Sequence, residues 1–166
     1  MAENNKRDIL ELSYDDILGE VKDLGQQAFR GQQVVNWLNK GVKSFDDMTN
    51  LPQETRKMLE RKFKIGSLKI KESLISHDKE TIKYLCLLED HNIIECVVMS
   101  YRHGNTLCLS TQVGCKMGCE FCESTREGLI RDLTLGEMVS QVFVVNDHLK
   151  GLGRKSIGNI VLMGSG

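Results

Sequence analysis

The amino-acid sequence predicts an α/β fold made of an N-terminal helical domain, short antiparallel strands and one strand–helix–strand unit. Up to residue 64, apolar residues recur at the three-to-four-residue spacing of helices. From Leu68 the spacing changes to that of strands, and polar turn residues separate successive runs. After residue 133, a helix-start signal and an apolar stripe precede a short apolar run. We therefore divide the chain into residues 1–64, a β-rich connecting segment at 65–100, and residues 101–166.

Three helices are expected in the first 64 residues. Ser13 is a possible N-cap of the first helix, and Gly25 ends it. The second helix ends near Gly41, and Asn50 caps a third helix that has Pro52 in its first turn. Basic residues on or beside the third helix can be read as phosphate contacts or, equally well, as a solvated face with interleaved glutamates: Arg56, Lys57, Arg61, Lys62 and Lys64.

Residues 68–111 predict four strands, at 68–76, 81–88, 93–99 and 106–111, which form an antiparallel meander. The last of them leads into a cysteine-rich loop. Thr134 and Glu137 then fit a capping box for a helix that reaches about Leu149. The run 157–163 suits a buried parallel strand, so the loop and helix belong to one right-handed βαβ unit. This order places the loop at the carboxyl end of a strand, where α/β barrels keep their sites.

Composition limits the class of protein. The chain has 166 residues, of which 40% are hydrophobic, so it can build the core of one medium domain or two small ones. A net charge of −1 gives no global signal for nucleic acid, so any RNA surface must be a local patch. The sequence contains no membrane-length apolar run and no export signal, and we expect no membrane partner and a cytoplasmic location. Its six cysteines then indicate reduced thiols rather than a disulfide framework.

Three cysteines in one loop carry the main chemical signal. Cys115, Cys119 and Cys122 are spaced by four and three residues, and Gly114 and Gly118 permit the positive φ angles of a tightly curled backbone. An iron–sulfur cube takes one cysteine on each of its four irons, so three thiols leave one iron open. The residues alone also allow a structural zinc site or no metal at all. The nearest fourth ligand for zinc is His103.

Several stretches, taken together, resemble the RlmN/Cfr family of radical S-adenosylmethionine (radical SAM) methyltransferases. They are the cysteine loop and residues 29–33, 45–52, 94–99, 106–115, 128–134 and 159–164. The likeness extends over essentially all 166 residues. It implies the N-terminal portion of such an enzyme: a helical accessory domain followed by the start of a truncated, partial TIM-type barrel. RlmN-type members methylate C2 of an adenine in 23S rRNA and in tRNA, whereas Cfr-type members methylate C8 of the same rRNA adenine. The sequence does not separate the two reactions.

The resemblance also implies roles for individual residues. Cys115, Cys119 and Cys122 would hold a [4Fe-4S] cluster, whose open iron binds S-adenosylmethionine. Cys108 would be the resolving cysteine, which forms a disulfide with a methyl-carrying cysteine, and Glu95 would be the proton acceptor. Without the resemblance, Cys108 reads as a small buried residue and Glu95 as an outward-facing strand residue. The implied partners are 23S rRNA, tRNA and a reductase that supplies electrons, with a full-length form that is monomeric.

The sequence departs from the family pattern at two points. Glu123 follows the third loop cysteine, where a small residue is expected, and it adds negative charge beside an anionic cluster. The methyl-carrying cysteine and most S-adenosylmethionine contacts are absent from the 166 residues. We therefore expect this chain to be part of a longer enzyme, and to bind a labile cluster without methylating RNA by itself. A non-catalytic fragment that binds a cluster or zinc is the alternative.

Overall fold

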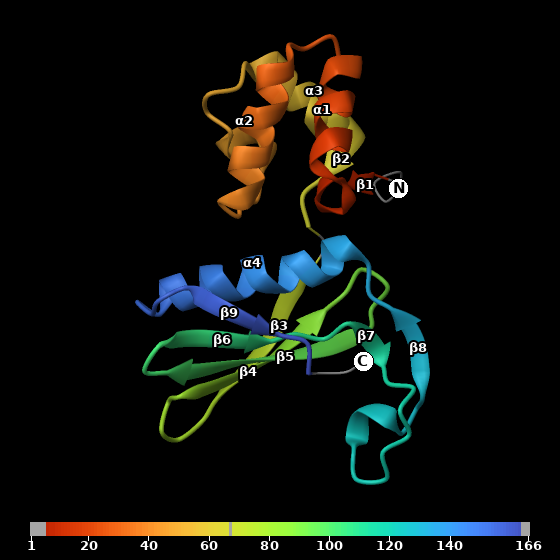
Figure 1. The fold of residues 1–166 in the computed structure, drawn as a ribbon, viewed down its shortest axis with the longest axis vertical. Helices are drawn as coiled ribbons and strands as arrows, with labels where there is room; N and C mark the ends of the chain where they lie inside the picture. The colour runs from red at the N-terminus through yellow and green to blue at the C-terminus, as the bar shows by residue number, and fades with distance from the viewer. Residues whose placement is uncertain (1–5, 67, 164–166) are drawn as a thin grey trace. The chain divides into compact units, whose positions relative to one another are not determined.

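A computed structural model of the protein describes residues 6–66 and 68–163. The chain divides into two compact units, Met1–Ser67 and Leu68–Gly166, called here the helical unit and the sheet unit (Figure 1). Within the described residues, no helix is both long enough and apolar enough to cross a membrane. The further boundary expected at residue 101 stays a prediction.

The helical unit contains the three expected helices, α1 (Tyr14–Asp23), α2 (Ala28–Asn39) and α3 (Gln53–Lys62). Of two single 3-10 turns, η1 (Ile9–Glu11) precedes α1 and η2 (Phe45–Asp47) lies between α2 and α3. Two short strands that the sequence did not reveal, β1 (Arg7–Asp8) and β2 (Phe63–Lys64), pair in parallel at the ends of the unit. Fully buried side chains come from η1, all three helices, the residue after η2, and β2: Ile9, Val21, Val34, Met48, Leu59 and Phe63.

Of the two helix caps expected in this unit, one is confirmed and one is wrong. The Ser13 Oγ accepts a hydrogen bond from the Asp16 N–H, and the Asp16 carboxylate accepts one from the Ser13 N–H. Asn50 does not cap α3, because the N-cap position belongs to Pro52, which makes no side-chain cap bond. The Asn50 Oδ1 instead accepts a 2.6 Å hydrogen bond from the indole N–H of Trp37. Asn50 therefore ties the segment before α3 to α2.

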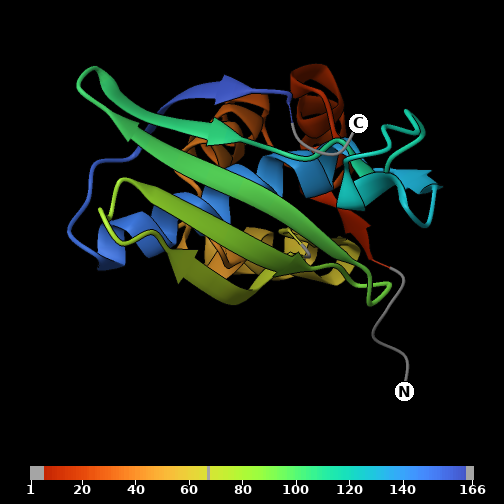
Figure 2. The same ribbon diagram turned by 90° about the horizontal axis from the view of Figure 1, so that it is seen from below.

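The sheet unit is built on a five-stranded sheet with the order β3-β4-β5-β6-β9. Strands β3 (Lys69–Ile75), β4 (Thr81–Leu87), β5 (Ile93–Tyr101) and β6 (Gly104–Cys108) form the expected antiparallel meander. Strand β9 (Ile157–Val161) pairs in parallel with β6, and helix α4 (Leu135–Gly151) connects them. The helix lies against one face of the sheet (Figures 1 and 2). The expectation that residues 157–163 are buried is wrong, because β9 is an edge strand of the described sheet and its central residues are exposed.

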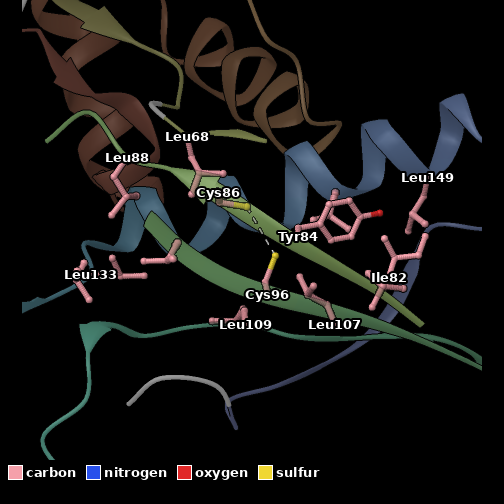
Figure 3. Packing of buried hydrophobic residues seen from close by; sticks show 14 residues of the cluster. Leu68, Ile82, Tyr84, Cys86, Leu88, Cys96, Leu107, Leu109, Leu133 and Leu149 are labelled. Atoms are coloured by element: carbon pink, nitrogen blue, oxygen red, sulfur yellow. Dashed lines mark hydrogen bonds between the residues drawn. The ribbon is translucent and has the colours of Figure 1, made fainter. Parts of the chain in front are cut away.

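The core of the sheet unit lies between α4 and the sheet. Alternate residues of β4 and β5 point toward the helix, as strand geometry requires. Figure 3 shows this cluster, which includes Ile82, Tyr84, Cys86, Cys96, Leu107 and Leu149. The Sγ atoms of Cys86 and Cys96 are 3.9 Å apart. The hydrogen bond with Cys86, and then burial, raises the pKa of the Cys96 thiol, so this thiol stays protonated at neutral pH.

A second, two-stranded sheet follows β6, and the sequence did not predict it. Strands β7 (Gln112–Gly114) and β8 (Leu129–Asp132) pair in antiparallel and enclose the cysteine loop, which contains the single turn η3 (Glu123–Thr125). The expected strand at 106–111 was to lead into the loop directly. Instead β6 ends at Cys108, and the chain starts a new strand at Gln112. Strands of three and four residues are too short to show an alternating pattern.

Arg131 of β8 joins this hairpin to the rest of the unit. Its two Nη atoms donate to the two carboxylate oxygens of Glu137, each at 2.8 Å, and its Nε donates to Asp90 at 2.8 Å. Glu137 is buried in the first turn of α4 and also accepts from the Thr134 N–H, which confirms the expected capping box. Burial alone would raise the pKa of Glu137, but the hydrogen bonds from Arg131 and Thr134 outweigh it and lower that pKa.

In the helical unit, the Asp8 carboxylate is buried at the β1–β2 pair. Its Oδ1 accepts hydrogen bonds from the N–H groups of Leu10 (3.0 Å) and Gly66 (3.1 Å). Its Oδ2 is buried with no hydrogen-bond partner in the described part of the chain. Burial raises the pKa of Asp8, and the two backbone hydrogen bonds offset only part of that effect.

The raised pKa of Asp8 predicts how the stability of the helical unit depends on pH. Because the folded pKa is raised, the folded state binds the proton more tightly than the unfolded chain does. The contribution of Asp8 to the free energy of unfolding is fully present below the pKa that Asp8 has in the unfolded chain. It is lost as the pH rises through the pKa that Asp8 has in the folded state. Each unit of difference between the two pKa values is worth about 1.4 kcal/mol. Replacing Asp8 by Asn should remove this part of the pH dependence.

The measurement is urea unfolding at several pH values above about 4, followed by the fluorescence of Trp37, the single tryptophan of the chain. The exposed Asp23, replaced by Asn, is the matched control and should keep the parent's pH dependence. An Asp8→Asn variant with the same pH dependence as the parent would contradict the prediction.

Arg131→Met should destabilise the sheet unit by about 2–3 kcal/mol, because it leaves the buried Glu137 carboxylate without its two strongest donors. Amide hydrogen exchange in β7 and β8 measures the loss. Arg126→Met is the control. This substitution removes an ion pair with Glu123 in which the Arg126 side chain is 75% exposed and the Glu123 side chain 81% exposed. It should therefore change the stability little. Adding Glu137→Leu to Arg131→Met should restore part of the stability. If the double variant instead lost as much stability as the two single variants together, Arg131 and Glu137 would not be energetically coupled.

Candidate functional site

The cysteine loop is the chain between β7 and β8 (Figure 1), and its own backbone closes it. The Cys115 N–H donates to the Gly128 carbonyl at 3.2 Å, which joins the two ends of the loop. The Thr125 hydroxyl accepts from the Gly118 N–H at 2.8 Å and donates to the Cys115 carbonyl at 3.1 Å. Thr125 thereby fixes the stretch between the first two cysteines. Sequence reasoning assigned it no role, since nothing in a single threonine indicates such a bridge.

Both expected positive φ angles are present, at 74° for Gly114 and 68° for Gly118. At Gly118 an added Cβ would meet no atom within 4 Å. At Gly114 it would lie 2.0 Å from the Gly128 carbonyl oxygen, which is backbone and cannot move aside. Glycine at Gly114 is therefore required by close approach of the two hairpin strands as well as by backbone conformation.

The three loop thiols are the donor set for a metal centre. Cys115 is buried, Cys119 and Cys122 are half-buried, and the Cys122 N–H donates to the Cys119 carbonyl at 3.0 Å. The chemistry of three thiols on one closed loop fits an iron–sulfur cluster. In the described residues, however, no three Cys, His, Asp or Glu side chains are gathered as a ready metal site. The loop backbone is thus ordered by hydrogen bonds, while the thiols are not preassembled.

His103 does not join these thiols. It lies in the turn between β5 and β6, where its ring stacks on Tyr101, with ring centroids 5.2 Å apart. That turn is at the opposite end of β6 from the cysteine loop (Figure 1). The fold therefore gives no support to the zinc alternative that took His103 as a fourth ligand.

Glu95 and Cys108 lie on the face of the sheet that α4 does not cover. The neighbours of Glu95 on β5, Ile94 and Cys96, point into the core, so Glu95 points to the other face. Cys108 on β6 is paired with Val97, which is two residues from Glu95 on the same face. The two predicted catalytic residues thus share a sheet face on adjacent strands.

A cavity of about 740 Å³ lies between this face and the cysteine loop. The sheet contributes Lys83, Asn92 and Glu95 to its lining, and the loop contributes Glu123, Ser124 and Arg126. Glu95 therefore lines the same cavity as other residues of the loop, whereas Cys108 and the three loop cysteines are not part of the lining. Lys83, which sequence reasoning missed, places its Nζ 2.7 Å from the Glu95 Oε1 across β4 and β5. Only the strand register brings these two residues together.

The segment between Cys108 and the loop is fixed by α4. The side-chain amide of Gln141, fully buried, accepts from the Ser110 N–H at 3.1 Å and donates to the Ser110 carbonyl at 3.0 Å. The Ser110 hydroxyl donates to the Glu95 carbonyl at 2.6 Å. One residue thus links the helix, the strand that carries Glu95 and the start of the loop.

Gly114→Ala should disrupt the hairpin and release the cysteine loop, because the new Cβ collides with the Gly128 carbonyl. Gly118→Ala is the matched control: it has the same kind of φ angle but open space, so it should cost only about 1 kcal/mol. Hydrogen exchange of the loop amides, above all that of Cys115, measures the difference. Equal protection in the two variants would contradict the steric argument.

Comparisons with known proteins agree with this architecture. A family model described as the ribosomal RNA large subunit methyltransferase N-terminal domain matches residues 7–65. A probable dual-specificity RNA methyltransferase RlmN from Alkaliphilus oremlandii is 50% identical over 161 residues, which cover 97% of this chain and 46% of the relative. A protein of the same name from Clostridium beijerinckii is 46% identical over 158 residues, which cover 95% and 44%.

A solved structure gives the same result. The crystal structure of a radical SAM methyltransferase from Sphaerobacter thermophilus superposes with a TM-score of 0.87 at 34% identity, covering 96% of this chain and 47% of that one. The chain thus spans about half the length of the relatives that it matches. Over that length, helical unit and sheet unit alike, the chain is similar to proteins named RlmN and to a solved radical SAM methyltransferase, and its residues 7–65 match the RlmN N-terminal domain family.

Proposed function

We propose that this chain forms the accessory domain and the cluster-bearing start of the catalytic core of a radical SAM RNA methyltransferase. The substrate is C2 of an adenine in 23S rRNA and in tRNA. The observation that carries the proposal is the cavity that Glu95 shares with the closed three-cysteine loop, in a chain half identical to named RNA methyltransferases. The names of those relatives include dual specificity, which favours the RlmN-type reaction over C8 methylation.

The residues proposed to hold the cofactor are Cys115, Cys119 and Cys122. Three thiolates would hold a [4Fe-4S] cluster and leave one iron for S-adenosylmethionine. Bound in this way, the cluster and cofactor supply the one-electron chemistry that an unreactive aromatic C–H bond requires. Thr125 and Gly118 keep the backbone between the first two thiols in a curled form, so that ligand binding needs side-chain movement more than refolding.

Glu95 is proposed as the group that accepts the ring proton of the adenine. A carboxylate in the cavity wall can act as a positioned base. The ion pair with Lys83 holds the carboxylate in place on β5. Cys108 is proposed as the resolving thiol: it forms a disulfide with a methyl-carrying cysteine as the S–C bond between that cysteine and the RNA breaks, and the electron pair of the broken bond stays with the RNA. Its place on the same sheet face as Glu95 supports the assignment.

The proposal also covers the fold of the catalytic core, the partners, the location and the oligomeric state. The parallel pair β6 and β9, joined by α4, is proposed as the first unit of a partial TIM-type barrel. The partners are the two RNAs and a reductase that supplies electrons to the cluster. These substrates place the protein in the cytoplasm, and the full-length form is proposed to be a monomer.

Anaerobic reconstitution of the chain with iron and sulfide tests the proposal. We expect a [4Fe-4S] species whose EPR signal changes when S-adenosylmethionine is added. Replacing Cys115, Cys119 or Cys122 by Ala should abolish iron uptake, since each supplies one ligand. Cys108→Ser is the matched control and should load iron as the parent does. Stoichiometric zinc in place of iron, or full iron uptake without one of the three thiols, would overturn the assignment.

A further inference from the structure

One end of the sheet unit carries a compact basic and aromatic surface that the proposed reaction does not use. It consists of the β5–β6 turn and the α4–β9 connection, which lie together at the end of the sheet away from the cysteine loop (Figures 1 and 2). We call this surface the basic end and define it by five residues: Tyr101, Arg102, His103, Arg154 and Lys155.

Backbone contacts hold the two segments of the basic end together. The Asn105 side-chain amide donates to the Lys155 carbonyl at 2.5 Å, and Asn105 pairs with Ile157 where β6 meets β9. The Arg154 N–H donates to the Leu149 carbonyl at 2.9 Å and thereby fixes the chain as it leaves α4. The surface is thus presented by an ordered backbone, and little ordering entropy opposes binding to it.

The side chains of the basic end are available to a ligand. Tyr101 is 51% exposed, and its ring is stacked on His103 with an interplanar angle of 7°. Arg102 and Lys155 are exposed, and in the described part of the chain neither side chain makes an ion pair. The β3–β4 turn, which lies at the same end of the sheet, carries Lys79 together with Asp78 and Glu80, so the net positive charge is confined to the two segments that define the basic end.

We propose that the basic end is an RNA-contact surface, where Arg102 and Lys155 bind phosphates and the Tyr101–His103 stack receives an unpaired base. The inference rests on the proposed function in that RNA is the substrate class. Unpaired cations bind the phosphate backbone, and exposed ring faces stack on bases splayed from loops or bulges. A chain with a net charge of −1 needs such a local surface to attract RNA.

The distance between the basic end and the cavity limits which RNAs can contact both. Strand β5 has nine residues, which span roughly 30 Å at the usual rise per residue. An RNA that touches the basic end while presenting an adenine at the cavity must extend over that distance. A short single strand is too small a ligand for both contacts.

Fluorescence anisotropy of the chain with two labelled RNAs tests the inference. The first is a stem–loop with an unpaired adenine-rich loop, and the second is a fully paired duplex of the same stem. Arg102→Gln and Lys155→Gln should each weaken binding of both RNAs by about three- to tenfold and lower the salt dependence by about one phosphate contact. Tyr101→Leu should weaken the stem–loop at least about fivefold and leave the duplex unchanged.

Lys71→Gln is the matched control, since Lys71 is an exposed basic residue on β3, at the other edge of the sheet, and should bind as the parent does. Variants at Tyr101, Arg102 and Lys155 that bind like this control would overturn the inference, as would a parent that binds anionic vesicles but no RNA. Iron uptake by Arg102→Gln separates the two proposals. It should equal that of the parent whether or not RNA binding is lost, because the residue is remote from the cysteine loop.

Discussion

The bidentate pair between Arg131 and Glu137 is the contact on which the geometry of the site depends. The cysteine loop is attached to the unit by a two-stranded hairpin, which is too small to be stable alone. Arg131 joins this hairpin to the first turn of α4 and, through Asp90, to the turn between β4 and β5. Because the Glu137 carboxylate is buried and needs its two donors, the pair specifies one arrangement of hairpin and helix. The position of the cysteine loop is therefore fixed relative to the main sheet and α4.

Local signals in the sequence were sufficient for much of the fold. The expected N-cap at Ser13 and the expected capping box at Thr134 depend only on residues three positions apart, and both are present. The four strands of the meander were visible because polar turns separate them. Asn50 shows the limit of such signals. Its side chain suits a cap, but the indole of Trp37, which is distant in sequence, uses the same oxygen.

The candidate site shows the same division between local and distant information. The loop cysteines and the two glycines with positive φ were evident from spacing. Thr125, Lys83 and Gln141 were not, because each acts through a partner that only the folded chain brings near. The β7–β8 hairpin was missed for a related reason, since it is held by contacts with the rest of the unit, those of Arg131 and Val113 among them, rather than by a local pattern. Family resemblance supplied roles for Glu95 and Cys108, which their sequence surroundings alone do not indicate.

The buried pair Cys86 and Cys96 has a consequence for the assembly of the proposed metal centre. An unfolded chain offers iron six chemically similar thiols, in many wrong combinations. Once α4 has closed over the sheet, two of those sulfurs are sealed in hydrocarbon and cannot compete. For the proposed cluster, this burial means that iron offered to the folded sheet unit cannot reach these two thiols, so fewer wrong combinations of thiols are open to it.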